Sequence, residues 1–402
     1  MKILHILNHS FPLLDGYASR SQNILNAQKN MGWTPIVLTS PKHENDLKGK
    51  CPKKEKIGEH TFYRTGRNPF ENIPLLSEGF LLLLLFVKLV QVIIIEKPDI
   101  LHAHSPVLNY LPTWIIGKAF NLPVLYEIRA YWEDAGVDQA TYKEQSLKYR
   151  FVQSLETWAC KQVRHVAVLC DGIRKDLMVR GIKYKKLTPV FNGIHSENFT
   201  PCKPDTELVE KWGLKDKKVI GFIGSFFRWE GLDLLVEAFA KLVPNHPDLI
   251  LLLVGGGEEQ KNLQQQVLSL GLEERIIMPG RVPHHQVKGV YAMMDIMIYP
   301  RYSVRLTELV TPLKPLEAMA MEKAVIASDI GGHRELVKHD TTGILFPAGD
   351  ANALAKAITS LINDKAKMNS LGKAGRSYVL ANKTWEKTTS VYKQIYEKIK
   401  IC

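Results

Sequence analysis

Short apolar segments of strand length alternate with longer amphipathic segments along the whole chain. Strands that alternate with helices are typical of parallel sheets covered by helices. The predicted strands of the first half span residues 2–7, 35–39, 100–103, 123–126, 165–169 and 187–191, and those of the second half span 218–223, 249–254, 276–278, 296–299, 324–327 and 343–346. The pattern therefore predicts an α/β protein with two doubly wound, Rossmann-like domains.

The alternation stops between residues 192 and 217, where Pro201, Pro204 and a cluster of charged residues follow Asn192-Gly193. Such a stretch is typical of a domain boundary. We predict an N-terminal domain over residues 1–192 and a C-terminal domain over 193–383. In doubly wound folds the ligand lies at the carboxyl ends of the strands, so motifs that follow strands are the ones to examine.

Residues 79–95 form a strongly apolar stretch that contains Lys88 and Gln91. It is shorter than the roughly 20 apolar residues that cross a bilayer. We predict a helix buried in the first α/β domain. The alternative is a helix that lies in a membrane interface with a large apolar face exposed.

The composition of the chain limits the classes of molecule that it is expected to bind. The formal charge of +12 and the isoelectric point near 9.2 favour an anionic partner, either a phosphate-bearing substrate or an acidic lipid surface. Nucleic acid is not expected, because no zinc-finger, RNP or basic-region pattern accompanies the charge. The five scattered cysteines indicate reduced thiols in a cytoplasmic protein, and the first residues form a strand pattern rather than a signal peptide.

The most informative segment is residues 301–332, where a polar loop broken by prolines leads into a short helix that carries Glu317. A loop before a helix presents unpaired N–H groups that suit a phosphate, and a carboxylate inside the helix can accept hydrogen bonds from ribose hydroxyls. The segment is therefore expected to hold a sugar nucleotide.

Residues 311–320, Thr-Pro-Leu-Lys-Pro-Leu-Glu-Ala-Met-Ala, and 327–332, Ala-Ser-Asp-Ile-Gly-Gly, resemble the donor-binding segment of the GT-B retaining glycosyltransferases of family 4. The similarity is greatest to members associated with bacterial exopolysaccharide loci. It implies transfer of a sugar from a nucleotide donor, UDP- or GDP-linked, with retention at the anomeric carbon. It also implies no metal and no separate cofactor, and a final helix over residues 384–400 that packs back on the first domain.

The resemblance assigns donor-binding roles to residues of the second domain and to the first loop: Gly16, Gly224, Ser225, Arg228, Gly255, Gly257, Arg281, Val282, Arg305, Pro315, Leu316 and Glu317. Relatives carry Arg and Lys where this chain has Ser225 and Glu230. Lys314, Arg305 and Arg301 are the candidates to replace that charge, and Lys314 is the first of them. Relatives also carry a Glu where Leu309 stands; either the preceding Glu308 takes its role near the sugar, or backbone amides of residues 310–316 do.

On the acceptor side, Glu127 matches a position where relatives place a His against the transferred sugar. A carboxylate there can stabilise developing positive charge, and we expect Glu127, Glu308 and Lys314 to be catalytic. His104, Arg129 and Trp132 are expected to contact acceptor or sugar. His102 is expected in the core, and we expect His102 and His104 on opposite faces of their strand, so that they cannot share a metal.

The sequence thus predicts a cytoplasmic glycosyltransferase that acts on a lipid-linked or polysaccharide acceptor, with contact to the inner face of an anionic membrane left open. Two other functions stay open: a GT-B sugar-nucleotide 2-epimerase, and a non-catalytic protein that binds sugar nucleotides.

Overall fold

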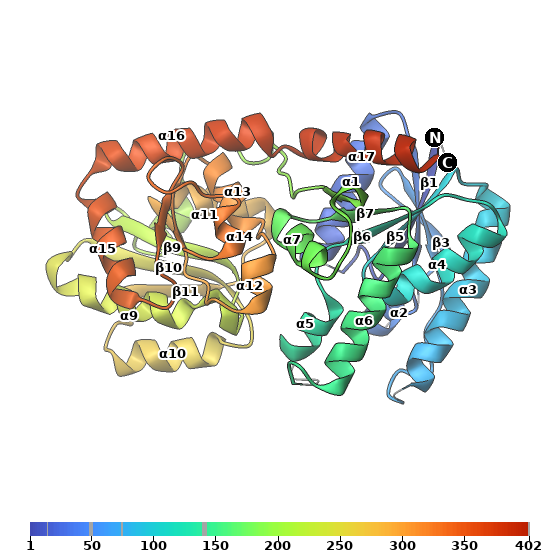
Figure 1. Ribbon diagram of the computed structural model, residues 1–402. Coiled ribbons are helices and arrows are strands. Elements are labelled where there is room, and N and C mark those ends of the chain that lie inside the picture. Colours follow the sequence, from blue (N-terminus) through green and yellow to red (C-terminus); the bar gives the residue numbers. More distant parts are fainter. Residues whose placement is uncertain (14, 48–50, 74, 139–142, 401–402) are drawn as a thin grey trace. The chain divides into compact units, whose positions relative to one another are not determined.

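The computed structural model describes residues 1–400 apart from 14, 48–50, 74 and 139–142, and the chain divides into two compact units (Figure 1). Unit 1 comprises Met1–Asn192 and the C-terminal segment from Trp385; unit 2 comprises Gly193–Thr384. Each unit contains one mostly parallel sheet covered by helices. The predicted α/β class with two doubly wound domains is confirmed.

Unit 1 contains an eight-stranded sheet with the strand order β3-β4-β2-β1-β5-β6-β7-β8. Its neighbouring strands run parallel except for β3 and β4, which are antiparallel. The elements are β1 (Lys2–Leu7), α1 (Gly16–Asn30), β2 (Thr34–Thr39), α2 (Lys42–Leu47), β3 (Lys54–Ile57), β4 (His60–Arg64), α3 (Leu76–Glu96), β5 (Ile100–His104), α4 (Val107–Ala119), β6 (Val124–Ile128), α5 (Trp132–Asp138), α6 (Leu147–Gln162), β7 (His165–Val168), α7 (Asp171–Val179), η1 (Tyr184–Lys186), β8 (Leu187–Pro189) and α17 (Trp385–Lys400).

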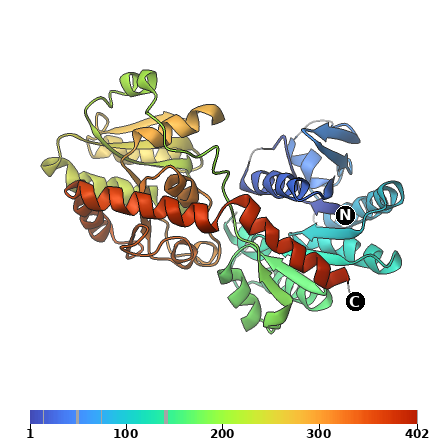
Figure 2. The ribbon, with the colours of Figure 1, turned by 90° about the horizontal axis from the view of Figure 1, so that it is seen from above.

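The two faces of this sheet differ in what covers them. Leu4 and Ile6 of β1 pack with residues of α3 and α4, whereas Leu7 packs with Leu25 of α1. Side chains alternate along a strand, so the odd and even positions of β1 serve opposite faces. Helix α17 packs beside α1, as Figure 2 shows for the red and dark blue helices. The face under α1 and α17 is the one that carries the polar residues described below.

Helix α3 is not buried as predicted. Its inner positions Leu85, Leu89, Val92 and Ile93 pack in the core of unit 1, but much of its remaining surface is exposed. Among the described residues it is the one helix whose length and composition would suffice to cross a membrane. The prediction was wrong because hydropathy gives the apolar content of a helix and not the number of its faces that find a partner.

Unit 2 contains a six-stranded sheet with the order β11-β10-β9-β12-β13-β14, whose neighbouring strands are all parallel. Its elements are α8 (Thr206–Lys211), β9 (Lys218–Ser225), η2 (Arg228–Glu230), α9 (Leu232–Leu242), η3 (Val243–Asn245), β10 (Leu249–Gly256), α10 (Gln260–Ser269), β11 (Ile276–Gly280), η4 (His284–Gln286), α11 (Val287–Met293), β12 (Ile296–Tyr299), α12 (Arg305–Leu309), α13 (Lys314–Ala320), β13 (Ala324–Ser328), α14 (Gly331–Arg334), β14 (Ile344–Phe346), α15 (Ala351–Ile362) and α16 (Lys365–Asn382). The carboxyl ends of its parallel strands meet at one edge, where the motifs of residues 224–332 lie.

Candidate functional site

Two glycines lie side by side where β9 and β10 end. Gly224 and Gly255 are paired in register, with φ angles of +150° and +142°. A Cβ atom on Gly255 would lie 1.8 Å from the carbonyl oxygen of Gly224, and one on Gly224 would lie 2.4 Å from Cε of Lys314. Only glycine permits this approach. Gly255 therefore lets the two strand ends approach each other, and Gly224 leaves room for the side chain of Lys314.

Lys314 belongs to a buried ion-pair cluster at this edge. Its Nζ donates to Oε1 of Glu230 at 2.7 Å, and Arg301 donates from Nε and Nη2 to Oε2 and Oε1 of Glu230 at 3.1 and 2.8 Å. The Glu230 side chain is 2% exposed, whereas those of Lys314 and Arg301 are 21% and 11% exposed. Two cations share one carboxylate, so the cluster carries an excess positive charge that points to an anionic ligand.

The charges explain how Glu230 stays ionised. Burial alone would raise the pKa of Glu230, but the charges of Arg301 and Lys314 outweigh it and lower the pKa to about 2. Burial lowers the pKa of Lys314, and the Glu230 charge opposes that shift. The sequence indicated Lys314 and Arg301 as replacement cations, but it presented Glu230 only as a lost charge. The structure instead gives Glu230 the role of positioning both cations.

Replacing Glu230 by Gln should destabilise the protein by about 2–3 kcal/mol at pH 7, because Lys314 and Arg301 lose their counter-ion. A carboxyl whose pKa is lowered on folding contributes stability above its unfolded pKa, near 4.5, and loses it as the pH falls toward 2. The difference between wild type and Glu230→Gln should therefore shrink between pH 4.5 and pH 2 in urea unfolding. Glu237→Gln, at an exposed carboxylate on α9, is the matched control. A constant difference over that pH range would contradict this account.

Glu317 lies one turn into α13, on the same helix as Lys314. Its Oε2 accepts a hydrogen bond from the hydroxyl of Tyr291 at 2.8 Å, and the hydroxyl of Tyr299 donates to the carbonyl of Lys314 at 3.0 Å. Both tyrosines are buried, so they fix the helix over the sheet edge. Helix α13 has only seven residues, so the charge at this edge comes from its side chains rather than from a long helix dipole.

Both carboxylate oxygens of Glu308, on α12, accept hydrogen bonds. Oε1 accepts from the hydroxyl of Ser303 at 2.6 Å, and Oε2 accepts from the backbone N–H of Gly331 at 2.7 Å. A Cβ atom on Gly331 would lie 2.2 Å from the carbonyl oxygen of Glu308, so α12 and α14 are in close contact here. In this structure Glu308 therefore joins two short helices, and a role against the sugar would require it to exchange those partners.

The other predicted donor residues surround the same edge. Arg228 and Arg281 are exposed; the backbone N–H of Arg228 donates to Glu258, and Arg281 lies near Gly256. The remaining positions are half-buried or buried beside them: Ser225, Gly257, Val282, Arg305, Pro315 and Leu316. Pro315 and Leu316 have buried side chains, so only their backbone groups can face a ligand.

Three of the unit 1 residues predicted to act on the sugar or acceptor are instead buried. Glu127 and His104 are fully buried and Arg129 is 5% exposed. Oε1 of Glu127 accepts from Arg20 at 3.0 Å and lies 3.3 Å from Nε of Arg129, while Oε2 accepts from the hydroxyl of Tyr392. In this structure residues of α1 and α17 cover these three side chains, so direct contact with a sugar would require them to exchange their present partners. The catalytic and acceptor roles stay predictions.

Seven buried polar side chains of unit 1 form a ring of polar contacts. Arg129, which can only donate, lies 2.8 Å from Nδ1 of His104, so the His104 proton must be on Nε2 and is donated to Nδ1 of His5 at 2.9 Å. The donors then follow one another in a single direction: Nε2 of His5 to Oε1 of Gln28, Nε2 of Gln28 to the hydroxyl of Tyr396, that hydroxyl to Nδ1 of His102, and Nε2 of His102, at 3.1 Å, toward Glu127. Burial is the largest cause that lowers the pKa of all three histidines, a direction that favours the neutral form that this order of donors and acceptors uses.

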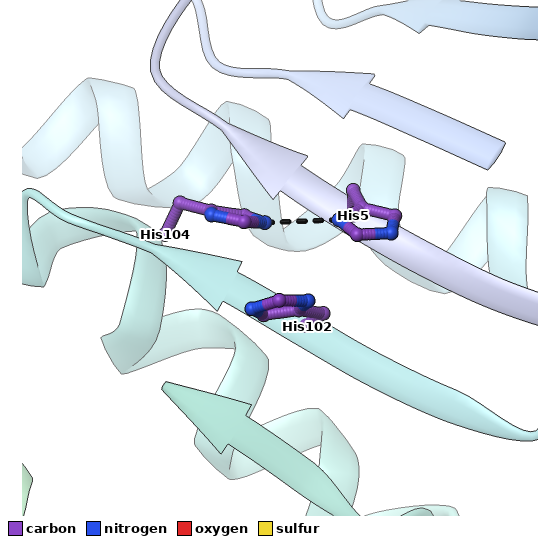
Figure 3. Close-up of side chains that lie close together, drawn as sticks. All are labelled: His5, His102 and His104. Atoms are coloured by element: carbon purple, nitrogen blue, oxygen red, sulfur yellow. Dashed lines mark hydrogen bonds between the residues drawn. The ribbon is translucent and has the colours of Figure 1, made fainter. Parts of the chain in front are cut away.

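The prediction that His102 and His104 lie on opposite faces was wrong. Positions two apart on a strand share a face, and the two rings stack with centroids 4.0 Å apart, with His5 of the adjacent strand beside them (Figure 3). Their ligand atoms and that of His5 lie within 4.8 Å of one another, close enough to hold a metal ion. Each of the six ring nitrogens already has a polar neighbour within 3.1 Å. A metal would therefore have to break the ring.

Gly16 and Trp132, the two remaining predicted residues of unit 1, begin α1 and α5 respectively. Gly16 is exposed, and a Cβ atom there would meet no atom within 4 Å. Asp15 caps α1 by accepting from the N–H of Ala18 at 2.8 Å. Gly16 therefore has no packing reason to be glycine, which is compatible with the predicted ligand contact.

Family models match both halves of the chain. Residues 15–198 match Glycosyltransferase Family 4, and residues 204–378 match Glycosyl transferases group 1. Among curated relatives, an uncharacterized glycosyltransferase of Methanocaldococcus jannaschii is 23% identical over 63% of this chain and 63% of its own length. A lipopolysaccharide core biosynthesis mannosyltransferase of Rhizobium leguminosarum bv. viciae is 30% identical over 53% of this chain and 60% of its own length. The chain thus spans less than two thirds of either relative.

Solved structures share the complete fold. A sucrose-phosphate synthase from Thermosynechococcus elongatus superposes with a TM-score of 0.80 at 24% identity, covering 99% of this chain and 98% of that one. The Anabaena protein HepE in complex with UDP superposes with a TM-score of 0.75 at 18% identity, covering 99% of this chain and 100% of that one. At these identities the likeness concerns the fold, which is GT-B.

Proposed function

We propose that the protein transfers a sugar from a nucleotide-sugar donor to a lipid-linked or polysaccharide acceptor, because its first half matches Glycosyltransferase Family 4 and its second half matches Glycosyl transferases group 1. The observation that carries the proposal is the arrangement at the carboxyl edge of unit 2. There Glu230 holds Lys314 and Arg301, and Glu317 lies on the same short helix as Lys314.

Each part of this edge suits one part of a nucleotide sugar. Lys314 and Arg301 supply positive charge for a diphosphate, and Glu317 can accept hydrogen bonds from the ribose hydroxyls. Charge on a departing diphosphate is stabilised best by cations that are already in place, which is what the Glu230 ion pairs provide. We infer a reaction that depends on positioning and on this stabilisation, with retention at the anomeric carbon and the leaving diphosphate accepting the acceptor proton.

We propose a UDP- or GDP-linked donor without a metal cofactor, and a place in bacterial exopolysaccharide or other cell-surface glycan synthesis. Relatives include a lipopolysaccharide core mannosyltransferase, and solved neighbours include HepE in complex with UDP-glucose. We also propose a cytoplasmic location at the inner face of the membrane.

Both matched families are glycosyltransferases, which disfavours the 2-epimerase alternative. A non-catalytic sugar-nucleotide-binding protein is distinguished from an enzyme by turnover. Slow hydrolysis of the donor, or transfer to a lipid-linked acceptor, would favour the enzyme.

The donor is tested by thermal shift with UDP-, GDP- and ADP-sugars. A ligand at one hundred times its Kd stabilises a protein by about 2.7 kcal/mol, so one nucleotide class should raise the Tm by about 5 °C. The matching nucleoside monophosphate should give a smaller shift, since it lacks the β-phosphate that Lys314 and Arg301 are expected to bind. If no sugar nucleotide shifts the Tm, the proposed donor site is wrong.

A further inference from the structure

Helix α3 presents an apolar stripe to the outside of unit 1. Leu76, Leu83, Val87 and Ile94 are 48%, 56%, 48% and 60% exposed, and their spacing places them on one face of the helix. We call these four residues the α3 stripe. The opposite side of the helix packs into the core of unit 1 and against α4. Because part of its surface is held in the core, α3 can lie on a membrane but cannot cross one while unit 1 stays folded.

The residues beside the α3 stripe indicate what covers it. A second helix packing on such a stripe in water normally finds charged residues along both sides of the seam. Here the flanking positions 79, 84, 86 and 91 are Gly, Leu, Phe and Gln. Protein interfaces also have a polar rim, whereas the charged residues of α3, which are Glu78, Lys88 and Glu96, are not among these flanking positions. A lipid surface requires neither charged residues along both sides of the stripe nor a polar rim.

Positive charge lies next to the stripe. Lys88 is on α3 itself; its pKa is lowered by burial and by the charge of nearby Lys53. Lys53 is exposed, as are Lys54 and Lys56 of the adjoining β3. Lysine side chains beside an apolar helix face can bury their stems and place their ammonium groups among anionic headgroups. The charge thus complements an anionic bilayer.

We propose that the α3 stripe, together with Lys53 and Lys88, docks unit 1 on an anionic lipid bilayer. The apolar side chains enter the boundary between headgroups and acyl chains, and the lysines contact the headgroups. Docking would bring the protein to a lipid-linked acceptor and so extends the proposed function. Only the class of acceptor in this proposal rests on the proposed function.

Flotation with phosphatidylcholine vesicles, with and without 30% phosphatidylglycerol, about a third of the lipid, tests the proposal. Wild type should float with the anionic vesicles and much less with phosphatidylcholine alone. The double variant Leu83→Glu, Val87→Glu should float at least about tenfold less, because it places two charges in the apolar contact. Lys53→Gln with Lys88→Gln should weaken anionic binding by about fivefold per lysine. Leu268→Glu, at a leucine that is 60% exposed on α10, is the matched control and should float like wild type.

Folding, association and donor binding are measured on the same samples. Both α3 residues are exposed, so the double variant should keep its Tm and its thermal shift with the donor. The proposal is overturned if wild type does not float, or if the double variant floats like wild type. It is also overturned if light scattering shows a dimer that the double variant converts to a monomer with unchanged flotation. Flotation without a donor shift would overturn the proposed function and leave the docking surface standing.

Discussion

Replacing Glu317 by Ala should lower kcat/KM for the nucleotide sugar by roughly 10²- to 10³-fold, because hydrogen bonds to a charged acceptor contribute about 1.5–3 kcal/mol each and two ribose hydroxyls would lose theirs. The donor-induced thermal shift should disappear as well. The truncation also removes the acceptor of the buried Tyr291 hydroxyl, a cost of about 1–2 kcal/mol in folding. Steady-state kinetics and urea unfolding measure the two effects separately.

The variant Glu317→Gln separates charge from packing. It can still accept from Tyr291 and so should unfold near the wild-type urea concentration, yet it should bind the donor at least about tenfold more weakly because its acceptor is neutral. The control Glu273→Gln changes an exposed glutamate before β11, at the amino edge of the same sheet. If Glu317→Gln retained wild-type donor affinity, the assignment of Glu317 to the ribose would be wrong.

The fold was predictable where the pattern is local. Buried parallel strands such as β9 and β10 are continuous apolar runs, and they stand out from the amphipathic segments between them. The edge strand β3, Lys-Glu-Lys-Ile, was missed because its side chains alternate between exposed and half-buried and it has no apolar face to reveal it. Strand β4 was missed with it, although its positions are largely buried.

The placement of the candidate site residues was also predictable where it depends on one segment. Lys314 and Glu317 lie three residues apart on one short helix, so their chemistry could be inferred from a single segment. The role of Glu230 depends on Arg301 and Lys314, each more than seventy positions away, and no local pattern indicates such a pairing. In unit 1 the local sequence suggested a ligand contact that residues distant in the sequence prevent in this structure. Glu127 follows a strand as a ligand-binding carboxylate would, but residues from α1 and α17 cover it, and the sequence near Glu127 gives no sign of them.

Replacing Glu127 by Ala should destabilise unit 1 by about 3–5 kcal/mol, since Arg20 and Arg129 would remain buried without a counter-ion. Urea unfolding followed by tryptophan fluorescence measures this, and five of the seven tryptophans lie in unit 1. The charges of Arg20 and the other buried partners overcome the effect of burial and hold the pKa of Glu127 well below its usual value. Its contribution is therefore present above about pH 4.5 and is lost as the pH falls.

The control Glu386→Ala removes an exposed carboxylate from α17 and should change stability by less than about 0.5 kcal/mol. Tyr392→Phe removes only the hydroxyl that α17 donates to Glu127, and a cost of about 1–3 kcal/mol is expected because one buried carboxylate oxygen loses its donor. In a double-mutant cycle, Glu127→Ala and Tyr392→Phe should be strongly non-additive, since both act on the same hydrogen bond. Additive costs would mean that the hydrogen bond between Tyr392 and Glu127 does not stabilise the packing of α17. A Glu127→Ala protein as stable as wild type would favour direct contact of Glu127 with the transferred sugar.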